Sequence, residues 1–240
     1  MEKLIYLLWT PEGQSPDQTS KMLLGECAPR LLELGPRMLS MNINDSDADV
    51  PAPVPTPEGE QPLAAEVCIW LDCLDRRQPF EEVLQRAGCR MAGYLVTESL
   101  YTDYGGNEHG KPRDWPDGKR SPGVLTVNLL QKLERLTYEE WLDHWYGTMS
   151  PVSEKIQPRM RYVRNTVVRP ITPDAPPLKG IVDEAWPSAA HITDPMLFYG
   201  AKGSKERMEE NIKRIFEAST GFIDMDSFRA VTMSEYLLKS

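Results

Sequence analysis

The sequence predicts an α+β fold made of two β-α-β-β-α-β units whose antiparallel sheets pack against each other as a barrel. The first supporting observation is an internal repeat, because a shift of 122 positions places Leu7 on Leu129 and Pro29 on Pro151 without a gap. The second is that apolar runs and amphipathic helices follow the same order in both halves. Helices cover only one face of such a sheet, so a second copy is a suitable partner for the bare face.

Two units and a linker account for the chain. We assign residues 1–104 to the first unit, 105–122 to the linker and 123–240 to the second unit. In the first unit, residues 44–62 are acidic and rich in proline without a hydrophobic period, so we expect a mobile surface loop there. The linker is either a plain connector or a segment whose aromatic residues, including Trp115, cover the mouth of a pocket.

Apolar runs mark the predicted strands. In the first unit they lie at residues 3–9, 37–44, 66–71 and 89–99. In the second unit they lie at residues 124–132, 161–168, 180–186 and 229–236. With one helix after the first strand and another after the third, each unit has the ferredoxin-like, or split β-α-β, order.

Two helices begin with a capping box, in which an N-cap hydroxyl and a side chain three positions later bond to each other's backbone N–H groups. One box pairs Ser15 with Gln18, and the other pairs Thr137 with Glu140. We expect the first helix to kink or break at Pro29, which cannot donate a backbone hydrogen bond. Further helices are predicted at residues 79–87 and 204–216.

The composition argues against nucleic acid and membranes as partners. Of 240 residues, 40% are hydrophobic and 26% are charged, and the formal net charge of -9 offers no positive surface to polyanions. No run approaches the roughly 18 apolar residues of a membrane span, and no cleavage pattern follows the N-terminus, so we expect a cytoplasmic protein. The four cysteines include no C-x-x-C pair, which predicts free thiols.

Several motifs of the second half follow one another at characteristic spacings. They are Lys132 at a strand end, Thr137, Trp141, His144-Trp145, Met149-Ser150-Pro151, Tyr162 to Asn165, and Gly180 to Trp186. This order resembles the EthD-like family of the dimeric α+β barrel superfamily, here as a tandem fusion. The first half carries a weaker echo in Cys27-Ala28-Pro29. The resemblance implies a small-molecule site and is compatible with a homodimer, but fold does not fix activity.

One departure from the family pattern concerns proton transfer. The histidine that usually precedes Ala-Pro in the family is Met149 here and Cys27 in the first copy. A thioether cannot exchange protons near neutral pH as an imidazole can. Any acid–base role must therefore lie with other residues.

His144, Tyr162 and His191 are the predicted catalytic residues. His144 stands beside Trp145 on the capped helix, and His191 follows the third strand of its unit. Either imidazole could exchange a proton or ligate a haem, although each is also consistent with a structural or solvated histidine. Tyr162 opens the Tyr-x-x-Asn motif and offers a phenol as a proton carrier.

Six further residues are predicted to bind substrate: Tyr6, Asn128, Lys132, Arg161, Arg164 and Glu184. Asn128 interrupts an apolar strand, so it is either a hydrogen-bonded core amide or a polar group that faces a ligand inside the barrel. Tyr6 is its repeat counterpart and would face it from the other sheet. The arginines offer cations to a carboxylate. Adjacent Asp183 and Glu184 must point to opposite faces of their strand.

The sequence contains no metal-binding triad, nucleophile elbow, phosphate-binding loop or dinucleotide fingerprint, so we predict neither metal nor cofactor. A site of His, Tyr, Asn and Arg suits proton transfer on an apolar or aromatic small molecule. We predict a cofactor-independent lyase of the decarboxylase or dehydratase type, or an isomerase, that acts on an aromatic or polyketide-like carboxylic acid in catabolism. The alternatives are a non-catalytic small-molecule-binding accessory protein of an oxygenase pathway and a haem- or oxygen-using monooxygenase of the same superfold.

Overall fold

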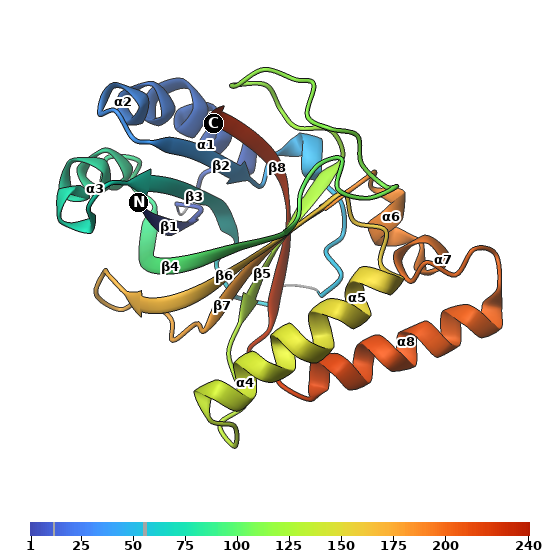
Figure 1. The fold of residues 1–240 in the computed structure, drawn as a ribbon. Helices are drawn as coiled ribbons and strands as arrows, with labels where there is room; N and C mark the ends of the chain where they lie inside the picture. Colours follow the sequence, from blue (N-terminus) through green and yellow to red (C-terminus); the bar gives the residue numbers. More distant parts are fainter. Residues whose placement is uncertain (12, 55–56) are drawn as a thin grey trace.

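The computed structural model describes residues 1–11, 13–54 and 57–240, and Figure 1 shows the ribbon. In this part of the chain, the strands close into one barrel in the order β1-β3-β2-β8-β5-β7-β6-β4. The first unit supplies β1 (Glu2–Trp9), β2 (Met38–Ile43), β3 (Leu63–Leu71) and β4 (Arg90–Thr102). The second supplies β5 (Val124–Leu130), β6 (Arg161–Pro170), β7 (Gly180–Trp186) and β8 (Arg229–Lys239). The predicted fold class is confirmed.

Two strand pairs join the units and close the barrel. Each unit is a four-stranded antiparallel sheet, β4-β1-β3-β2 in the first and β8-β5-β7-β6 in the second. The edge strand β2 pairs with β8, with Asn42 opposite Glu235, and the edge strand β4 pairs with β6, with Glu98 opposite Asn165. Both edges of each sheet therefore have a neighbour, which satisfies the backbone groups that an isolated unit would expose.

Helices cover the outside of the barrel on two sides (Figure 1). Over the first sheet lie α1 (Pro16–Met22), the π-helical η1 (Leu23–Cys27), α2 (Ala28–Glu33) and α3 (Gln78–Gln85). Over the second lie α4 (Tyr138–His144), the π-helical η4 (Trp145–Met149), α5 (Ser150–Ile156) and α8 (Lys205–Thr220). Short helices are η2 (Ser46–Ala48), η3 (Leu74–Arg76), α6 (Ala190–Thr193) and α7 (Pro195–Phe198). None of the described helices has the length and apolar character needed to cross a membrane.

The repeat extends to the caps and to the helix geometry. At the start of α4, Glu140 N donates to Thr137 Oγ1 at 3.2 Å, and Thr137 N donates to Glu140 Oε2 at 2.8 Å. Ser15 caps α1 in the same way, so both predicted capping boxes are confirmed. The helix does not end at Pro29, because α2 continues through it, but it widens into η1 just before this proline. The π-helical η4 lies 122 positions later, before Pro151. A proline cannot continue the i to i−4 ladder, and the wider π turn accommodates the missing donor.

Apolar side chains from both sheets fill part of the barrel lumen. Alternate residues of β1, β5 and β7 point inward and belong to one buried cluster, which includes Ile5, Leu7, Val127, Leu129 and Ile181. The bare faces of the two sheets are therefore buried against each other, as expected. Cys68 lies in this cluster, and all four cysteines are free thiols, as predicted.

The prediction that Tyr6 and Asn128 face each other inside the barrel is wrong. Tyr6 belongs to the cluster between the first sheet and its helices, and Asn128 contacts Glu184 on the outer face of the second sheet. Both β1 and β5 are buried on both faces. Apolar residues therefore occur on both faces of each strand. The sequence of these strands has no regular alternation of apolar and polar residues that would show which side chains point into the lumen.

A buried polar network crosses the lumen from the first unit to the second. The Lys3 ammonium donates to Glu98 Oε1 and to Asn165 Oδ1, both at 2.8 Å. Asn165 Nδ2 donates in turn to Asp183 Oδ2 at 3.1 Å. Burial, together with the neighbouring Asp183 carboxylate, raises the pKa of Glu66 well above its usual range, and a proton on Glu66 can bridge to Asp183. The two units are thus joined by charged groups as well as by strand pairing.

The loop between β2 and β3 lies across β8 of the second unit. Thr232 Oγ1 donates to Val50 O at 2.8 Å, and Arg229 forms a two-pronged ion pair with Glu60 at 2.9 and 2.5 Å. Mobility of this loop stays a prediction, and its residues 55–56 lie outside the described part of the chain. The first unit therefore reaches over the sheet of the second.

Replacing Glu66 with glutamine is expected to stabilise the fold increasingly as the pH rises. Because the folded pKa of Glu66 lies above its ordinary value of 4.5, the folded chain keeps a proton that the unfolded chain releases. The wild-type free energy of unfolding then falls as the pH rises above 4.5 towards the folded pKa, by at most about 1.4 kcal/mol per pH unit. Glutamine keeps the shape of the protonated acid without titrating. Chemical denaturation between about pH 5 and 8 measures the difference.

The control is Glu134→Gln, which changes an exposed carboxylate. Its free energy of unfolding should follow that of the wild type at each pH. A difference between Glu66→Gln and the wild type that stays constant over the whole range would contradict a protonated acid in the lumen.

Candidate functional site

A cavity of about 240 Å³ lies in the second unit, between the outer face of its sheet and the helical layer of η4, α7 and α8. Its walls are mainly aromatic and aliphatic and include Trp145, Met149, Phe198, Ile212, Ile215, Phe216, Phe222 and Phe228. Its polar floor consists of Asn128, Gln157, Tyr162 and Glu184. Small-molecule sites are typically apolar with a few convergent polar groups and hold roughly 300–1,000 Å³. The cavity therefore suits a compact apolar or aromatic molecule.

A chain of hydrogen bonds leaves the Tyr162 phenol free to donate into the cavity. Arg164 Nη1, which can only donate, reaches Ser150 Oγ at 3.1 Å, so Ser150 can direct its own proton to the Tyr162 oxygen at 3.1 Å. Trp145 Nε1 donates to the same phenol oxygen at 3.3 Å. With both lone pairs engaged in this way, the phenol has its proton available for a group in the cavity that it lines.

Burial keeps this phenol neutral. Tyr162 is 2% exposed, and desolvation raises the pKa of its hydroxyl above the ordinary value although the nearby Arg159 charge opposes the rise. The Arg159 guanidinium lies over the Tyr162 ring, 4.0 Å from its centroid. At neutral pH, Tyr162 is therefore a hydrogen-bond donor and not a base.

Glu184 is the carboxylate of the cavity floor, and its neighbours hold it in place. Arg159 Nη1 donates to Glu184 Oε1 at 2.5 Å, and Asn128 Nδ2 donates to Glu184 Oε2 at 3.0 Å. Arg159 is 1% exposed and also donates to Glu154 Oε2 at 3.1 Å. A buried guanidinium between two carboxylates has little freedom to move. The floor thus presents a fixed acceptor, Glu184, beside a fixed donor, Tyr162.

Three of the predicted residues line the cavity together: Asn128, Tyr162 and Glu184. Arg164 lies behind them, with its guanidinium 3.8 Å from the ring centroid of Tyr146 and 4.7 Å from that of Tyr101. Asp183 points into the lumen while Glu184 points outward, so the two do face opposite ways. Asn128, Tyr162 and Glu184 therefore share a cavity on the outer face of the sheet and not in the lumen.

Other predicted binding residues lie away from this cavity. The Tyr6 hydroxyl donates to Glu81 Oε1 at 2.9 Å under α3 of the first unit. Lys132 lies beyond the end of β5 and donates to two backbone oxygens of the following turn. Arg161 points into the lumen and donates to Glu235 at 2.9 Å, because its position on β6 has the opposite orientation to the next residue.

Neither predicted catalytic histidine lines the cavity. His144 Nε2 is hydrogen-bonded to Ala218 O at 2.9 Å and its ring stacks on Phe222, so it links α4 to α8. His191 lies on α6, where Nδ1 bonds to a serine hydroxyl at 2.9 Å. Among the described residues, the lining contains Met149 but no imidazole that could ligate a haem iron. The cavity therefore lacks the histidine ligand that His144 or His191 was expected to give a haem, and we derive no step through one.

Several residues of the site were missed from the sequence, among them Pro53, Val54, Ser150, Gln157 and Arg159. Arg159 lies in Pro158-Arg159-Met160, which the repeat matches to Pro36-Arg37-Met38, but Arg37 is exposed and pairs with Asp72. The repeat therefore contained no sign that Arg159 is buried. Pro53 and Val54 line the cavity from the first unit, and a loop of this composition has no pattern that predicts such a contact.

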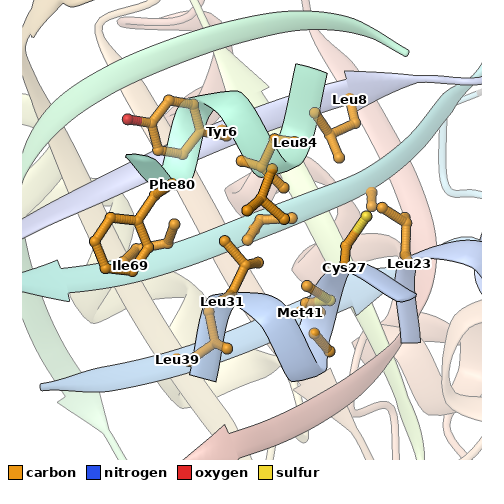
Figure 2. Close-up of a cluster of buried hydrophobic side chains, with 14 of the residues drawn as sticks. Tyr6, Leu8, Leu23, Cys27, Leu31, Leu39, Met41, Ile69, Phe80 and Leu84 are labelled. Atoms are coloured by element: carbon orange, nitrogen blue, oxygen red, sulfur yellow. The ribbon is translucent and has the colours of Figure 1, made fainter. Parts of the chain in front are cut away.

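Side chains fill the corresponding space in the first unit, as Figure 2 shows: Leu8, Leu23, Cys27, Leu31, Met41, Phe80 and Leu84 belong to one buried cluster there. Leu23 and Cys27 of η1 occupy the repeat positions of Trp145 and Met149. Tyr6 occupies the repeat position of Asn128. The two copies thus share a backbone plan, but the outer face of the first is a packed core.

Comparison with solved structures shows the same fold. An anthrone oxidase-like protein aligns at 11% identity over 100% of this chain and 94% of that chain, with a TM-score of 0.56. A chlorite dismutase from Candidatus Nitrospira defluvii, in complex with imidazole, aligns at 7% identity over 99% of this chain and 92% of that chain, with a TM-score of 0.52. These neighbours are members of the dimeric α+β barrel superfamily, and likeness at such low identity shows the fold alone. No family model and no curated protein matches the sequence significantly.

Substituting Arg159 with alanine is expected to lower the free energy of unfolding by about 3–5 kcal/mol, because Glu184 would be left as a largely buried carboxylate without its cation. Arg37→Ala is the matched control, since it removes the arginine at the same repeat position. The Arg37 side chain is 63% exposed, and loss of its ion pair with Asp72 should cause no measurable change. Chemical denaturation followed by circular dichroism compares them, and similar losses in both variants would contradict the role given to Arg159.

Proposed function

We propose that the second unit is a cofactor-independent acid–base enzyme, an isomerase or a dehydratase-type lyase, that acts on a compact aromatic or polyketide-like molecule. The observation that carries this proposal is the placement of a fixed carboxylate, Glu184, beside a phenol donor, Tyr162, on the floor of an otherwise apolar cavity. The order of motifs from Lys132 to Trp186 supports the same unit as the active one, and from it we infer membership of the EthD-like family.

Glu184 and Tyr162 have complementary roles in the proposed reaction. Tyr162 donates a hydrogen bond to a carbonyl oxygen of the ligand while Glu184 takes a proton from the adjacent carbon. The electron pair of the broken C–H bond moves onto the oxygen, where the phenol stabilises the enolate. Return of the proton from Glu184 to a different carbon completes an isomerisation. If hydroxide leaves from the next carbon instead, that proton joins it as water and completes a dehydration.

The charges at the floor favour a ketone or phenol over a free carboxylic acid as the ligand. Arg159 is engaged by Glu184 and Glu154, and Arg164 is engaged by Ser150. Neither guanidinium lines the cavity. The Glu184 carboxylate would also repel a ligand carboxylate in this environment of low polarity. Decarboxylation is therefore less favoured than isomerisation or dehydration.

Cofactor-independent oxygenation is a second candidate, because it begins with the same proton transfer to Glu184. The ligand carbanion would reduce dioxygen and form a C–O bond, and the proton held by Glu184 would convert the peroxide anion to a hydroperoxide. Loss of the second proton from the same carbon, together with hydroxide from the O–O bond, would then release water and leave a carbonyl group. The carbon is oxidised, and dioxygen supplies one oxygen atom to the product and one to water. An anthrone oxidase-like protein shares the fold, which makes anthrone a reasonable probe for both candidates.

Hydrogen exchange at the methylene carbon of anthrone, in deuterated buffer under nitrogen, tests the proton transfer. We expect the wild type to accelerate the exchange, Glu184→Gln to slow it about 100-fold or more, and Tyr162→Phe to slow it about tenfold or more. Glu154→Gln is the matched control, because it removes the other carboxylate partner of Arg159 outside the cavity. Its exchange rate should stay close to that of the wild type. Mass spectrometry follows the exchange.

The same assay in air separates the candidates. Oxygen uptake with formation of anthraquinone, lost in Glu184→Gln, would favour oxygenation. Quenching of tryptophan fluorescence at one anthrone per chain, without exchange or oxygen uptake, would leave a binding role alone. Equal exchange rates for the wild type and a folded Glu184→Gln variant would eliminate Glu184 as the base.

A further inference from the structure

Gln157 differs from the other polar side chains on the floor of the outer-face cavity. Asn128 and Glu184 are hydrogen-bonded to each other at 3.0 Å. The Tyr162 phenol is bonded to Ser150 at 3.1 Å. Gln157 also lines the cavity and is only 6% exposed, but its side-chain amide forms no hydrogen bond within the described part of the chain. Buried polar groups nearly always have a partner, so the space inside the cavity is where a partner for this amide would lie.

The backbone of Gln157 is held in place without help from its side chain. The residue follows the end of α5, and its N–H donates to Ser153 O at 2.8 Å while its carbonyl oxygen accepts from Arg159 N at 2.9 Å. The following residue, Pro158, restricts Gln157 to extended backbone, and its φ of −91° and ψ of 128° agree with this. Both backbone groups are engaged, and the side-chain amide is left available to a ligand.

The first unit has no amide at the equivalent position. The residue 122 positions before Gln157 is Gly35, which has a φ of +70°. A glycine in this left-handed conformation ends a helix and presents no side chain. The outer face of the first unit is a packed core. The amide therefore occurs in the copy that has the cavity and not in the copy whose equivalent space is filled.

The chemistry of the floor favours a neutral hydroxyl as the partner of Gln157. A glutamine amide offers one acceptor and two donor hydrogens but no charge. Glu184 would repel an anionic group, and a cationic group would pair with Glu184 and so occupy the base of the proposed reaction. A hydroxyl can donate to the amide oxygen or accept from the amide nitrogen, whereas a carbonyl oxygen can only accept. A hydroxyl therefore pairs with whichever end of the amide faces the cavity.

We propose that Gln157 determines specificity by binding a hydroxyl group of the ligand, in addition to the carbonyl that Tyr162 binds. The preferred ligand is then an aromatic ketone that carries a hydroxyl. This proposal rests on the proposed function, because it takes the outer-face cavity as the ligand site. A ligand that fills the cavity removes water from the Gln157 amide. A hydroxyl replaces the lost hydrogen bond, whereas an apolar group leaves the amide unpaired and weakens binding by about tenfold or more.

Fluorescence titration under nitrogen with the monohydroxy isomers of anthrone tests the proposal. Trp145 lines the cavity, so a bound ligand should quench tryptophan emission. Each isomer is compared with the anthrone that carries a methyl group at the same ring position, because methyl and hydroxyl groups are similar in size. We expect at least one hydroxyl isomer to bind the wild type about tenfold or more tightly than its methyl counterpart. The proposal is overturned if none does.

Gln157→Met locates the hydrogen bond, because methionine has a similar length and flexibility but no amide. This variant should bind the preferred hydroxyl isomer about tenfold or more weakly than the wild type does, and the methyl counterpart at least as tightly. Gln85→Met is the matched control, since it changes an exposed glutamine of α3, and it should keep the wild-type preference. A hydroxyl preference that persists in a folded Gln157→Met variant would overturn the proposal.

Hydrogen exchange, measured with the same ligands, separates this proposal from the proposed reaction. A hydroxyl preference that is lost in Gln157→Met, together with no exchange by the wild type, would support the role of Gln157 and contradict the reaction alone. Exchange by the wild type without any hydroxyl preference would contradict the role of Gln157 alone.

Discussion

The pairing of β2 with β8 and of β4 with β6 is the constraint on which the rest of the structure depends. It closes two four-stranded sheets into one barrel and turns their uncovered faces inward, where an apolar cluster and the Lys3 network fill much of the lumen. Two of the spaces that remain are large enough for a small molecule. One lies between a sheet and its helices, and the other lies at the end of the lumen.

The two units share the same helix geometry but differ in how closely the helices pack on the sheet. Each inserts a π-helical segment before a proline, so the same part of the helix faces the sheet in both. In the first copy the short α3 packs closely, and Leu23 and Cys27 help to complete a core. In the second copy the longer α8 and the aromatic residues of η4 surround a cavity with a polar floor. The chemistry proposed for the protein belongs to the copy that is incompletely packed.

The fold was predictable from the sequence because its signals are local. Capping boxes at Ser15 and Thr137, apolar strand runs and the repeat need only short stretches of chain. The orientation of strand residues was not predictable, because β1 and β5 are buried on both faces. Tyr162 could be chosen because it opens the Tyr-x-x-Asn motif, and Glu184 because it is a polar residue in a largely apolar strand. Arg159 could not, because its burial depends on contacts with side chains of α5 and β7.

Joining both halves in one chain has a consequence for the charges of the lumen. Strand pairing places Glu66 at the position equivalent to Ile181, and Asp183 at the position equivalent to Cys68. The acidic pair therefore occurs once, and its mate across the pseudo-two-fold axis is an apolar pair. In a dimer of identical chains, symmetry would repeat every substitution, and two acidic pairs would have to share one lumen. In a single chain the two halves can differ in sequence. The Glu66–Asp183 pair can therefore occur on one side of the lumen without a second copy on the other.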